Sequence, residues 1–446
     1  MAPERVIHWF RNDLRLGDNP ALAEACAAAG GLIPVYCHDP AVDAPTRWGF
    51  VRRGAHRRAF LAAALDDLDA ALRARGSRLL QLRGAPTEVL PVLARALGTD
   101  RLTCEAIAAP EEEGEVAALR AAGLRVTTVW QSSLLDPAAL PFALARLPKV
   151  FTAFRQAVES AGLRPAAPLA PPAALPPCPP LEQLAEPSVA ESGGSTDITP
   201  EVGAGICGEA SFPWWQPAFA GGERAALAHL ARYFASGRPP RYKATRNGLS
   251  GIDFSSKFSP WLAQGALSAR VAFAALRRHE AERGVSEGSY WLCFELLWRD
   301  YFRFLHLQHG RRLYRARGLN DAAPPPAHDP AAFAAWCAGR TGHAFVDAGM
   351  RELAATGWLS NRMRQVVASY LIHDLDCDWR AGAAWFEAQL VDYDVYSNQG
   401  NWLYIAGRGT DPRGGRRFDP DRQAATHDAD GGYRAWWCGT DRRSGA

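Results

Sequence analysis

The sequence lacks the features that mark several protein classes. Its nine cysteines include no C-x-x-C pair and no Cys/His grouping with zinc spacing, so neither a zinc site nor an iron–sulfur cluster is indicated. No apolar run approaches the ~20 residues that a membrane-spanning helix needs. The start, MAPERVIHWF, has no signal-peptide pattern, so we expect a cytoplasmic protein with reduced thiols. A formal net charge of only +3 excludes a strongly basic coat but not a local basic groove.

With 446 residues the chain is too long for one ordinary core, and two domains are expected. Short apolar runs that predict strands alternate with Ala/Leu-rich helical stretches in its first part. The runs span residues 6–10, 32–37, 78–82, 101–104 and 124–129, and the helical stretches span residues 21–29, 50–75, 86–97 and 111–122. This order predicts an α/β doubly wound, Rossmann-like domain with a parallel sheet over residues 1–165. Asn12, Asp13 and Arg15 follow the first strand where a glycine-rich turn would stand, so a dinucleotide site there is not supported.

A Pro/Gly/Ser-rich stretch, residues 166–222, follows that domain. Its composition cannot bury enough apolar surface to order itself, which predicts an interdomain linker. Residues 223–446 then show apolar spacing of three to four, which predicts an all-α domain. Its expected helices are 223–236, 259–264, 269–283, 289–309, 345–356, 359–375 and 379–392. The 15 tryptophans fit aromatic-lined pockets or plain core packing, and core packing is the commoner reason.

Two polar groups in the helical part are candidates for binding. Ser255, Ser256 and Ser259 precede a predicted helix, where hydroxyls and free N–H groups suit a phosphate, although such residues are more often helix caps. Glu295 and Arg299 share a helix face with Trp298. An ordinary i,i+4 salt bridge explains this pair at least as well as a pocket wall does.

Two further segments place polar residues in apolar surroundings. Asn361, Arg364 and Gln365 project from the first turns of one predicted helix and need protein or ligand partners. The segment DYDVYSNQGNWLY, residues 392–404, packs acidic, amide and aromatic side chains together, and an Arg/Gly loop follows it. Such a loop can follow phosphates, although most are solvated surface. None of these segments alone decides the function.

In order and spacing the segments resemble the photolyase/cryptochrome family. WFRNDLRLGDNPAL (residues 9–22) is similar to its N-terminal hallmark, and KFSPWLAQGALSAR, FELLWRDYFRF and TGWLSNRMRQVVASYL are similar to its flavin-domain blocks. TRNGLSGIDFSSKFSPWLA and GNWLYIAGRGTDPRGGRRF most resemble the DASH cryptochromes. The resemblance covers nearly the whole chain outside the linker.

The resemblance implies FAD bound noncovalently in the helical domain. The implied contacts on its phosphate side are Tyr242, Ser255, Ser256, Lys257, Phe258 and Ser259. Those implied around the ribityl chain and the ring are Glu295, Arg299, Asn361, Arg364, Asp392, Asp394 and Asn398. Asp392 is expected to pair with Arg364, and removal of either would leave a buried charge unpaired. Asn398 corresponds to the position facing flavin N5, where an amide suits an anionic reduced flavin.

The implied reaction is light-driven electron donation from reduced FAD to a cyclobutane pyrimidine dimer, the activity of a deoxyribodipyrimidine photo-lyase. Glu295 and Trp298 match the dimer pocket, and Asn361 and Gln365 stand where six-four photolyases need histidines. Tyr404 replaces a tryptophan, which fits the DASH preference for single-stranded or looped DNA. The implied partner is dimer-containing DNA, with RNA as a second candidate, no membrane, and a monomeric protein.

Two positions depart from the family pattern. Its tryptophan electron chain runs through Trp402 and Trp379, but the outermost member falls near Pro326, and proline cannot carry an electron hole. Ala108 and Ala109 stand where folate-binding relatives place a carboxylate, so a methenyltetrahydrofolate antenna is not supported. Glu111–Glu113 is an alternative source of that carboxylate, although a solvated helix start is the commoner reason for such a run.

Two other functions stay open beside repair. One is a blue-light photoreceptor or signalling flavoprotein that binds nucleic acid; the other is a flavoprotein without activity. Only a short tail follows the last motif, and Glu295 and Trp298 are retained, which favours repair.

Overall fold

The computed structural model describes residues 4–179 and 210–439. The predicted parallel sheet is present in the order β3-β2-β1-β4-β5, and all its neighbouring strands run parallel. Its strands are β1 (Arg5–Phe10), β2 (Gly31–His38), β3 (Leu80–Arg83), β4 (Arg101–Glu105) and β5 (Arg125–Val129). The α/β doubly wound prediction is therefore confirmed, with strand boundaries within two residues of those expected.

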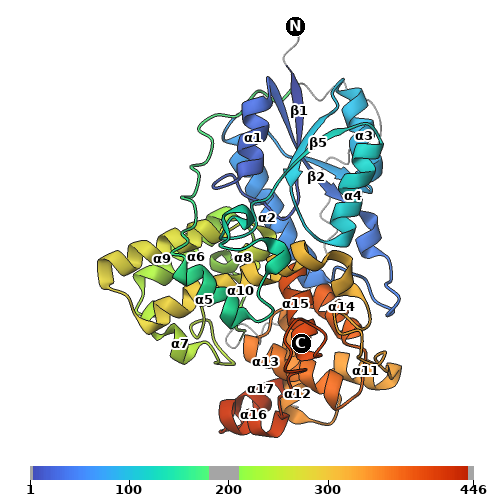
Figure 1. Cartoon of the computed structure of the whole chain (residues 1–446), viewed down its shortest axis with the longest axis vertical. Coiled ribbons are helices and arrows are strands. Elements are labelled where there is room, and N and C mark those ends of the chain that lie inside the picture. Colours follow the sequence, from blue (N-terminus) through green and yellow to red (C-terminus); the bar gives the residue numbers. More distant parts are fainter. Residues whose placement is uncertain (1–3, 180–209, 440–446) are drawn as a thin grey trace.

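Helices cover both faces of this sheet (Figure 1). They are α1 (Pro20–Ala28), α2 (Ala55–Arg73), α3 (Pro86–Ala96) and α4 (Pro110–Ala121). Alternate residues of β1 point to opposite faces, as strand geometry requires. Val6 and Phe10 join the core formed with α1 and α2, whereas Ile7 and Trp9 join the core formed with α3 and α4. Burial on both faces explains why β1 is a continuous apolar run.

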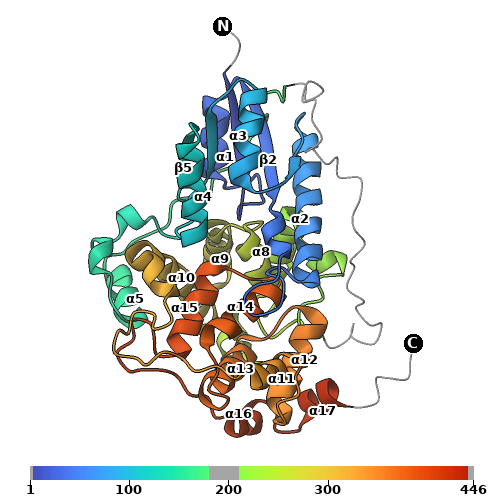
Figure 2. The same ribbon diagram turned by 90° about the vertical axis from the view of Figure 1, so that its right-hand side faces the viewer.

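The second domain is helical, and residues 210–439 contain no strand. Its longer helices are α6 (Glu223–Ala235), α9 (Ala269–Arg283), α10 (Glu287–His309), α12 (Ala344–Thr356), α13 (Asn361–His373), α14 (Trp379–Gln389) and α15 (Val395–Ile405). The shorter ones are α7 (Tyr242–Thr245), α8 (Ser259–Gln264), α11 (Pro330–Cys337), α16 (Pro420–His427) and α17 (Gly432–Cys438). Figure 2 shows the α/β domain above them, with α2 reaching down to α14.

Several elements differ from the expected ones. The helix predicted over residues 379–392 ends at Gln389, which leaves Asp392 and Asp394 in the turn before α15. Helices α11, α15, α16, α17 and α5 (Phe151–Ser160) were not predicted. Helix α5 packs against α10 of the second domain.

The two described ends of the predicted linker differ in burial: Leu169 is 47% exposed and held through its backbone, whereas the other end is packed. The backbone of Leu169 pairs with Asp18, and the side chain of Phe212 is fully buried in the core of the helical domain. The interpretation that this stretch cannot bury apolar surface is therefore wrong for residues 210–222, whereas none of residues 166–179 is buried. Its middle, residues 180–209, lies outside the described residues.

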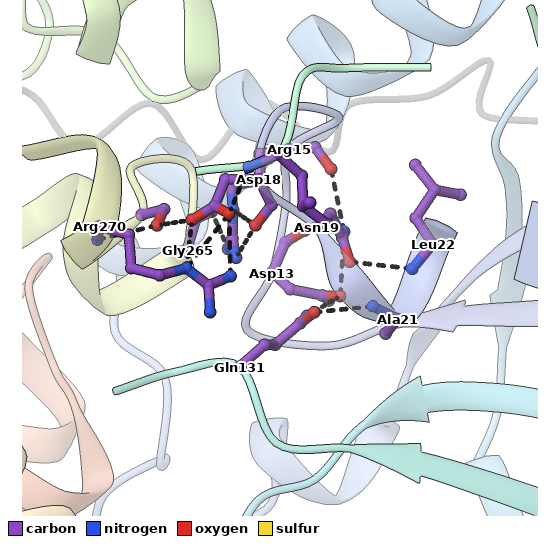
Figure 3. Close-up of polar contacts among 11 residues, drawn as sticks. Asp13, Arg15, Asp18, Asn19, Ala21, Leu22, Gln131, Gly265 and Arg270 are labelled. Atoms are coloured by element: carbon purple, nitrogen blue, oxygen red, sulfur yellow. Dashed lines mark hydrogen bonds and ion pairs between the residues drawn. The ribbon is translucent and has the colours of Figure 1, made fainter. Parts of the chain in front are cut away.

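The turn after β1 joins the two domains (Figure 3). The guanidinium of Arg15 donates to the carbonyl of Gly265 at 2.8 Å, and Arg270 forms an ion pair with the fully buried Asp18 at 2.9 Å. The side chain of Asn19 caps α1 by accepting from Leu22 N–H at 3.0 Å. Polar side chains thus fill the turn that holds a dinucleotide in other folds, and they fix α8 and α9 against the sheet domain.

Candidate functional site

A cavity of about 520 Å³ lies inside the helical domain. It brings together residues that are far apart in the sequence. The predicted residues that line it are Tyr242, Ser255, Ser256, Lys257, Phe258, Ser259, Glu295, Trp298, Arg299, Asn361, Arg364, Gln365, Asp392, Asp394 and Tyr404. A smaller adjoining hollow of about 90 Å³ shares Arg364 and Asp392 as walls and adds Asn398 and Trp402. Trp379 is the one predicted site residue that lines neither.

The serine segment at one end of the cavity does not cap α8. The N-cap residue of α8 is Phe258, and no side chain accepts a hydrogen bond from the first turn. The cap interpretation of Ser255, Ser256 and Ser259 is therefore wrong. Since α8 has only six residues, the hydroxyl groups at this end, rather than a long helix dipole, would suit a phosphate.

Lys257 lines the cavity, but its ammonium is buried between two rings. Its Nζ lies 3.4 Å from the ring centre of Phe254 and 4.1 Å from that of Trp358, and the side chain is 2% exposed. Burial lowers the pKa of Lys257 well below its usual value, although Glu352 opposes this. Nζ has no hydrogen-bond partner among the described residues.

Helix α10 presents Glu295, Trp298 and Arg299 to the cavity, as its predicted face requires. The alternative of an i,i+4 salt bridge is wrong, because Glu295 pairs with Arg246 of the segment after α7. Arg299 instead donates to the carbonyls of Ser132 and Leu262, which ties α10 to the sheet domain and to α8. Burial raises the pKa of Glu295, and Arg246 opposes the rise.

Aromatic rings form one wall of the cavity. Trp298 stacks on Phe151 of α5 with ring centres 3.8 Å apart and planes 11° apart. Tyr404 lies edge-on to Trp298 at 6.2 Å, and the guanidinium of Arg416 lies 5.2 Å from the Tyr404 ring. Because Phe151 holds Trp298 in one orientation, its other contacts are set before any ligand arrives.

A buried ion pair and an amide whose oxygen has no partner among the described residues lie where the cavity meets the hollow. Arg364 donates to both carboxylate oxygens of Asp392, at 3.0 and 2.8 Å, which confirms the expected pairing. Next to Arg364 on α13, the Oε1 atom of Gln365 is buried and has no hydrogen-bond partner among the described residues. A buried polar atom without a partner is unfavourable unless a ligand or water meets it.

Asp394 is already engaged by the protein. Its carboxylate pairs with Arg303 and accepts from Ser397 N–H at 2.7 Å, which caps α15. Burial opposes ionisation, but Arg303 and Arg299 together lower the pKa of Asp394 to about 2. The carboxylate is therefore charged over the whole physiological range.

Asn398 and Trp402 come from α15 and line the adjoining hollow. The Asn398 amide donates to the carbonyl of Ala383 at 3.0 Å, which fixes this side chain against α14. Trp402 is 2% exposed. These two side chains can be placed on one helix face only once α15 is known. The polar residues and Gly400 of α15 interrupt the spacing of apolar residues that would predict a helix.

A second cavity, of about 620 Å³, lies between the two domains. Trp379 lines it from the helical domain, and Trp48 lines it from the sheet domain. Glu112 lines this cavity, and burial raises its pKa. The interpretation of Glu111–Glu113 as a solvated helix start is therefore wrong for Glu112.

Among the lining residues of the first cavity that escaped prediction are Arg246, Trp291, Trp358 and Asn401. They stand in or beside segments that the sequence already singles out, at positions where no local spacing distinguishes them. Arg246, for example, reaches Glu295 only through tertiary packing. An amide such as Asn401, one helical turn after Ser397, becomes a candidate only once α15 is known.

The residues fit the implied FAD. One end of the cavity offers serine hydroxyls, and the other offers a guanidinium–carboxylate pair and a buried amide oxygen without a partner among the described residues. A parallel α/β domain joined to a helical domain with such a cavity defines a flavin-binding protein of the photolyase type.

Comparisons with known proteins agree. Residues 6–176 match the family model for DNA photolyase, and residues 291–443 match that for the FAD binding domain of DNA photolyase. The chain therefore belongs to the photolyase/cryptochrome family and carries its FAD-binding domain. Among the residues that the structure describes, no helix has the length and apolar character needed to cross a membrane.

Particular relatives place the chain with the DASH cryptochromes. It is 44% identical to Cryptochrome DASH of Xenopus laevis, over 98% of this chain and 83% of that protein. The crystal structure of a Synechocystis sp. cryptochrome is 39% identical with a TM-score of 0.89, covering 98% of this chain and 89% of that one. A bacterial class III photolyase from Agrobacterium tumefaciens is 28% identical with a TM-score of 0.79, covering 98% and 87%.

Proposed function

We propose that the protein uses blue light and FAD to repair cyclobutane pyrimidine dimers, preferentially in single-stranded or looped DNA. The observation that carries this proposal is the shared cavity. Glu295, Trp298 and Tyr404 form a polar and aromatic wall of the same space whose other walls are Arg364 and Asp392. A dimer and a flavin held there would lie next to each other.

The residues assigned to FAD divide by chemistry. The hydroxyls of Ser255, Ser256 and Ser259 hold its phosphates, while Arg364, fixed by Asp392, and Asn398 hold the flavin part. When bound and reduced, FAD supplies the light-driven electron that splits the dimer. Asp394 contributes indirectly, because it fixes the start of α15 and therefore the position of Asn398.

The dimer side of the cavity suits bases that have left the stack. Trp298 offers a flat surface held by Phe151, and Glu295, whose pKa burial raises, hydrogen-bonds the Watson–Crick edge. Tyr404 is a smaller stacking surface than an indole. Weaker stacking favours substrates whose bases are already unpaired, since removal of a base from a duplex costs a few kcal/mol.

The absence of a folate antenna stays a prediction. Ala108 and Ala109 are buried, so no carboxylate stands at the expected position. Glu112 nevertheless faces the interdomain cavity. An absorption spectrum of the purified protein without a folate band supports the prediction, and a folate band overturns it.

The experiment that tests the function is anaerobic blue-light illumination of the reduced, FAD-loaded protein with thymine-dimer oligonucleotides. We expect light-dependent repair of the single strand and weaker repair of the duplex. The same protein in the dark is the control. Full FAD occupancy without repair of either substrate would overturn the proposal and leave the photoreceptor function as the better account.

A further inference from the structure

Trp402, on the wall of the hollow, forms no ring–ring pair with Trp379, the tryptophan expected to follow it in electron transfer, within the described residues. Its ring contacts are Phe386 at 5.2 Å and Trp336 at 6.5 Å. Trp379 makes no aromatic ring contact within residues 4–179 and 210–439, and its Nε1 donates to the carbonyl of Ala316 at 3.1 Å. Since position 326 is a proline, the route through Trp379 has no further indole at that position.

A different series of aromatic ring contacts leads outward from Trp402. Trp336 is fully buried on α11 and stacks on Phe333, with ring centres 6.0 Å apart and planes 22° apart. Phe333 in turn contacts Trp48 at 6.4 Å. Trp48 is half-buried, comes from the sheet domain and lines the cavity between the domains. Ring contacts thus run without a gap from the hollow to a solvent-accessible indole in the other domain.

We propose that Trp336 and Trp48 carry the electron hole outward from Trp402, with Trp48 as the terminal residue in place of an indole at position 326. The inference rests on the proposed function only in taking the flavin as the light-driven electron acceptor. Phe333 lies between the two indoles and fills the space that the electron crosses. It is not itself oxidised, because a benzene ring loses an electron far less readily than indole.

Each transfer moves one electron inward. Trp402 gives an electron to the light-excited oxidised flavin, Trp336 restores Trp402, and Trp48 restores Trp336. The guanidinium of Arg47 lies 4.4 Å from the Trp48 ring and disfavours positive charge there. The oxidised Trp48 therefore releases its Nε1 proton to water. An added thiol returns one hydrogen atom to it and becomes a thiyl radical.

The surroundings of Trp48 favour it as the terminus over Trp336. Trp336 donates its Nε1–H to the carbonyl of Val367 at 3.0 Å and meets no solvent, so its proton has no exit to water. Within the described part of the chain, the ring of a third indole, Trp385, pairs with Phe50 alone, with ring centres 5.0 Å apart, and Phe50 then contacts Phe333 at 6.3 Å. That branch is one ring longer, which makes Trp385 the matched control.

The test illuminates the FAD-loaded, oxidised protein and follows the deprotonated indole radical by transient absorption. Oxidised tryptophan is then located by peptide mass spectrometry after prolonged illumination in air without added thiol, because dissolved oxygen adds to the indole radical and gives a stable product. We expect oxidation at Trp48 in the parent protein. Trp48→Phe and Trp336→Phe are expected to lose the long-lived radical, whereas Trp385→Phe and Trp379→Phe retain it and still show oxidised Trp48.

A long-lived radical that survives Trp48→Phe, or that is lost in Trp379→Phe but not in Trp336→Phe, overturns the proposal. Because Trp48 is half-buried, its phenylalanine variant tests the route even where replacement of the buried Trp336 impairs folding. Neither readout needs DNA. With FAD chemically reduced, the Trp48→Phe variant is expected to repair dimers as well as the parent protein does. If neither protein repairs dimers, the proposed function is overturned, but the electron route through Trp336 and Trp48 is not.

Discussion

The Nη2 atom of Arg364 donates to both carboxylate oxygens of Asp392, and Nε of the same guanidinium donates to the carbonyl of Leu359. The carboxylate is almost fully buried. The two residues come from α13 and from the turn before α15, so the pair joins both walls of the hollow. Their geometry presents a fixed cation to whatever occupies the cavity.

Replacement Asp392→Asn leaves the Arg364 charge without its partner. We expect a loss of about 3–5 kcal/mol in the free energy of unfolding, measured by urea denaturation, because a buried charge is then uncompensated. FAD retention after gel filtration should fall with it. The control is Asp100→Asn, which breaks an exposed pair with Arg125 and should change stability little. Equal losses in the two variants would contradict the importance of burial.

The pair of Asp394 with Arg303 predicts a specific acid dependence. The pKa of this carboxylate is about 2 in the folded protein and near 3.8 in the unfolded chain. Its contribution is therefore present above about pH 4 and is lost as pH falls toward 2; it amounts to about 2 kcal/mol. Asp394→Asn should lower stability at neutral pH and flatten the decline between pH 4 and 2. Urea denaturation at both ends of this range measures the difference, and an unchanged slope would count against the pair.

Gly265 allows the helical domain to pack closely against the turn after β1. A Cβ there would clash with the carbonyl oxygen of Asn12, and its φ of +67° already favours glycine. Gly265→Ala should cost about 3 kcal/mol, as strain and overpacking add. Gly98 has φ +62° and no atom within 4 Å of the place that a Cβ would take, so Gly98→Ala isolates the conformational part, about 1 kcal/mol. Similar melting temperatures for the two alanine variants would show that the contact with Asn12 is unimportant.

In the proposed function Trp298 stacks on the bases of the dimer, so Trp298→Ala should weaken binding of a single-stranded dimer. The expected loss is about 1–3 kcal/mol, the range for one base stacked on an aromatic ring. Fluorescence anisotropy with dimer-containing and undamaged oligonucleotides measures it. Trp385→Ala, which removes an indole that does not line the cavity, is the control. A loss confined to the undamaged oligonucleotide would argue against a dimer contact.

Periodic segments of this sequence predicted their own structure well. The strand at residues 6–10 and the helix at residues 269–283 match β1 and α9 because their burial patterns are regular. Helix α15 was missed because its polar residues line the hollow on one side, while Gly400 on the other side leaves room for the ring of Phe302. Partners chosen by tertiary packing, such as Arg246 for Glu295, leave no trace in local spacing.

The most direct test of the account is the yield of restored thymines per absorbed photon, with reduced FAD-loaded protein and a single-stranded thymine-dimer oligonucleotide. We predict light-dependent repair that is abolished in the dark and weakened by Glu295→Gln and Trp298→Ala when the yields are compared per bound FAD. Full FAD occupancy with no repair in the parent protein would contradict the central claim.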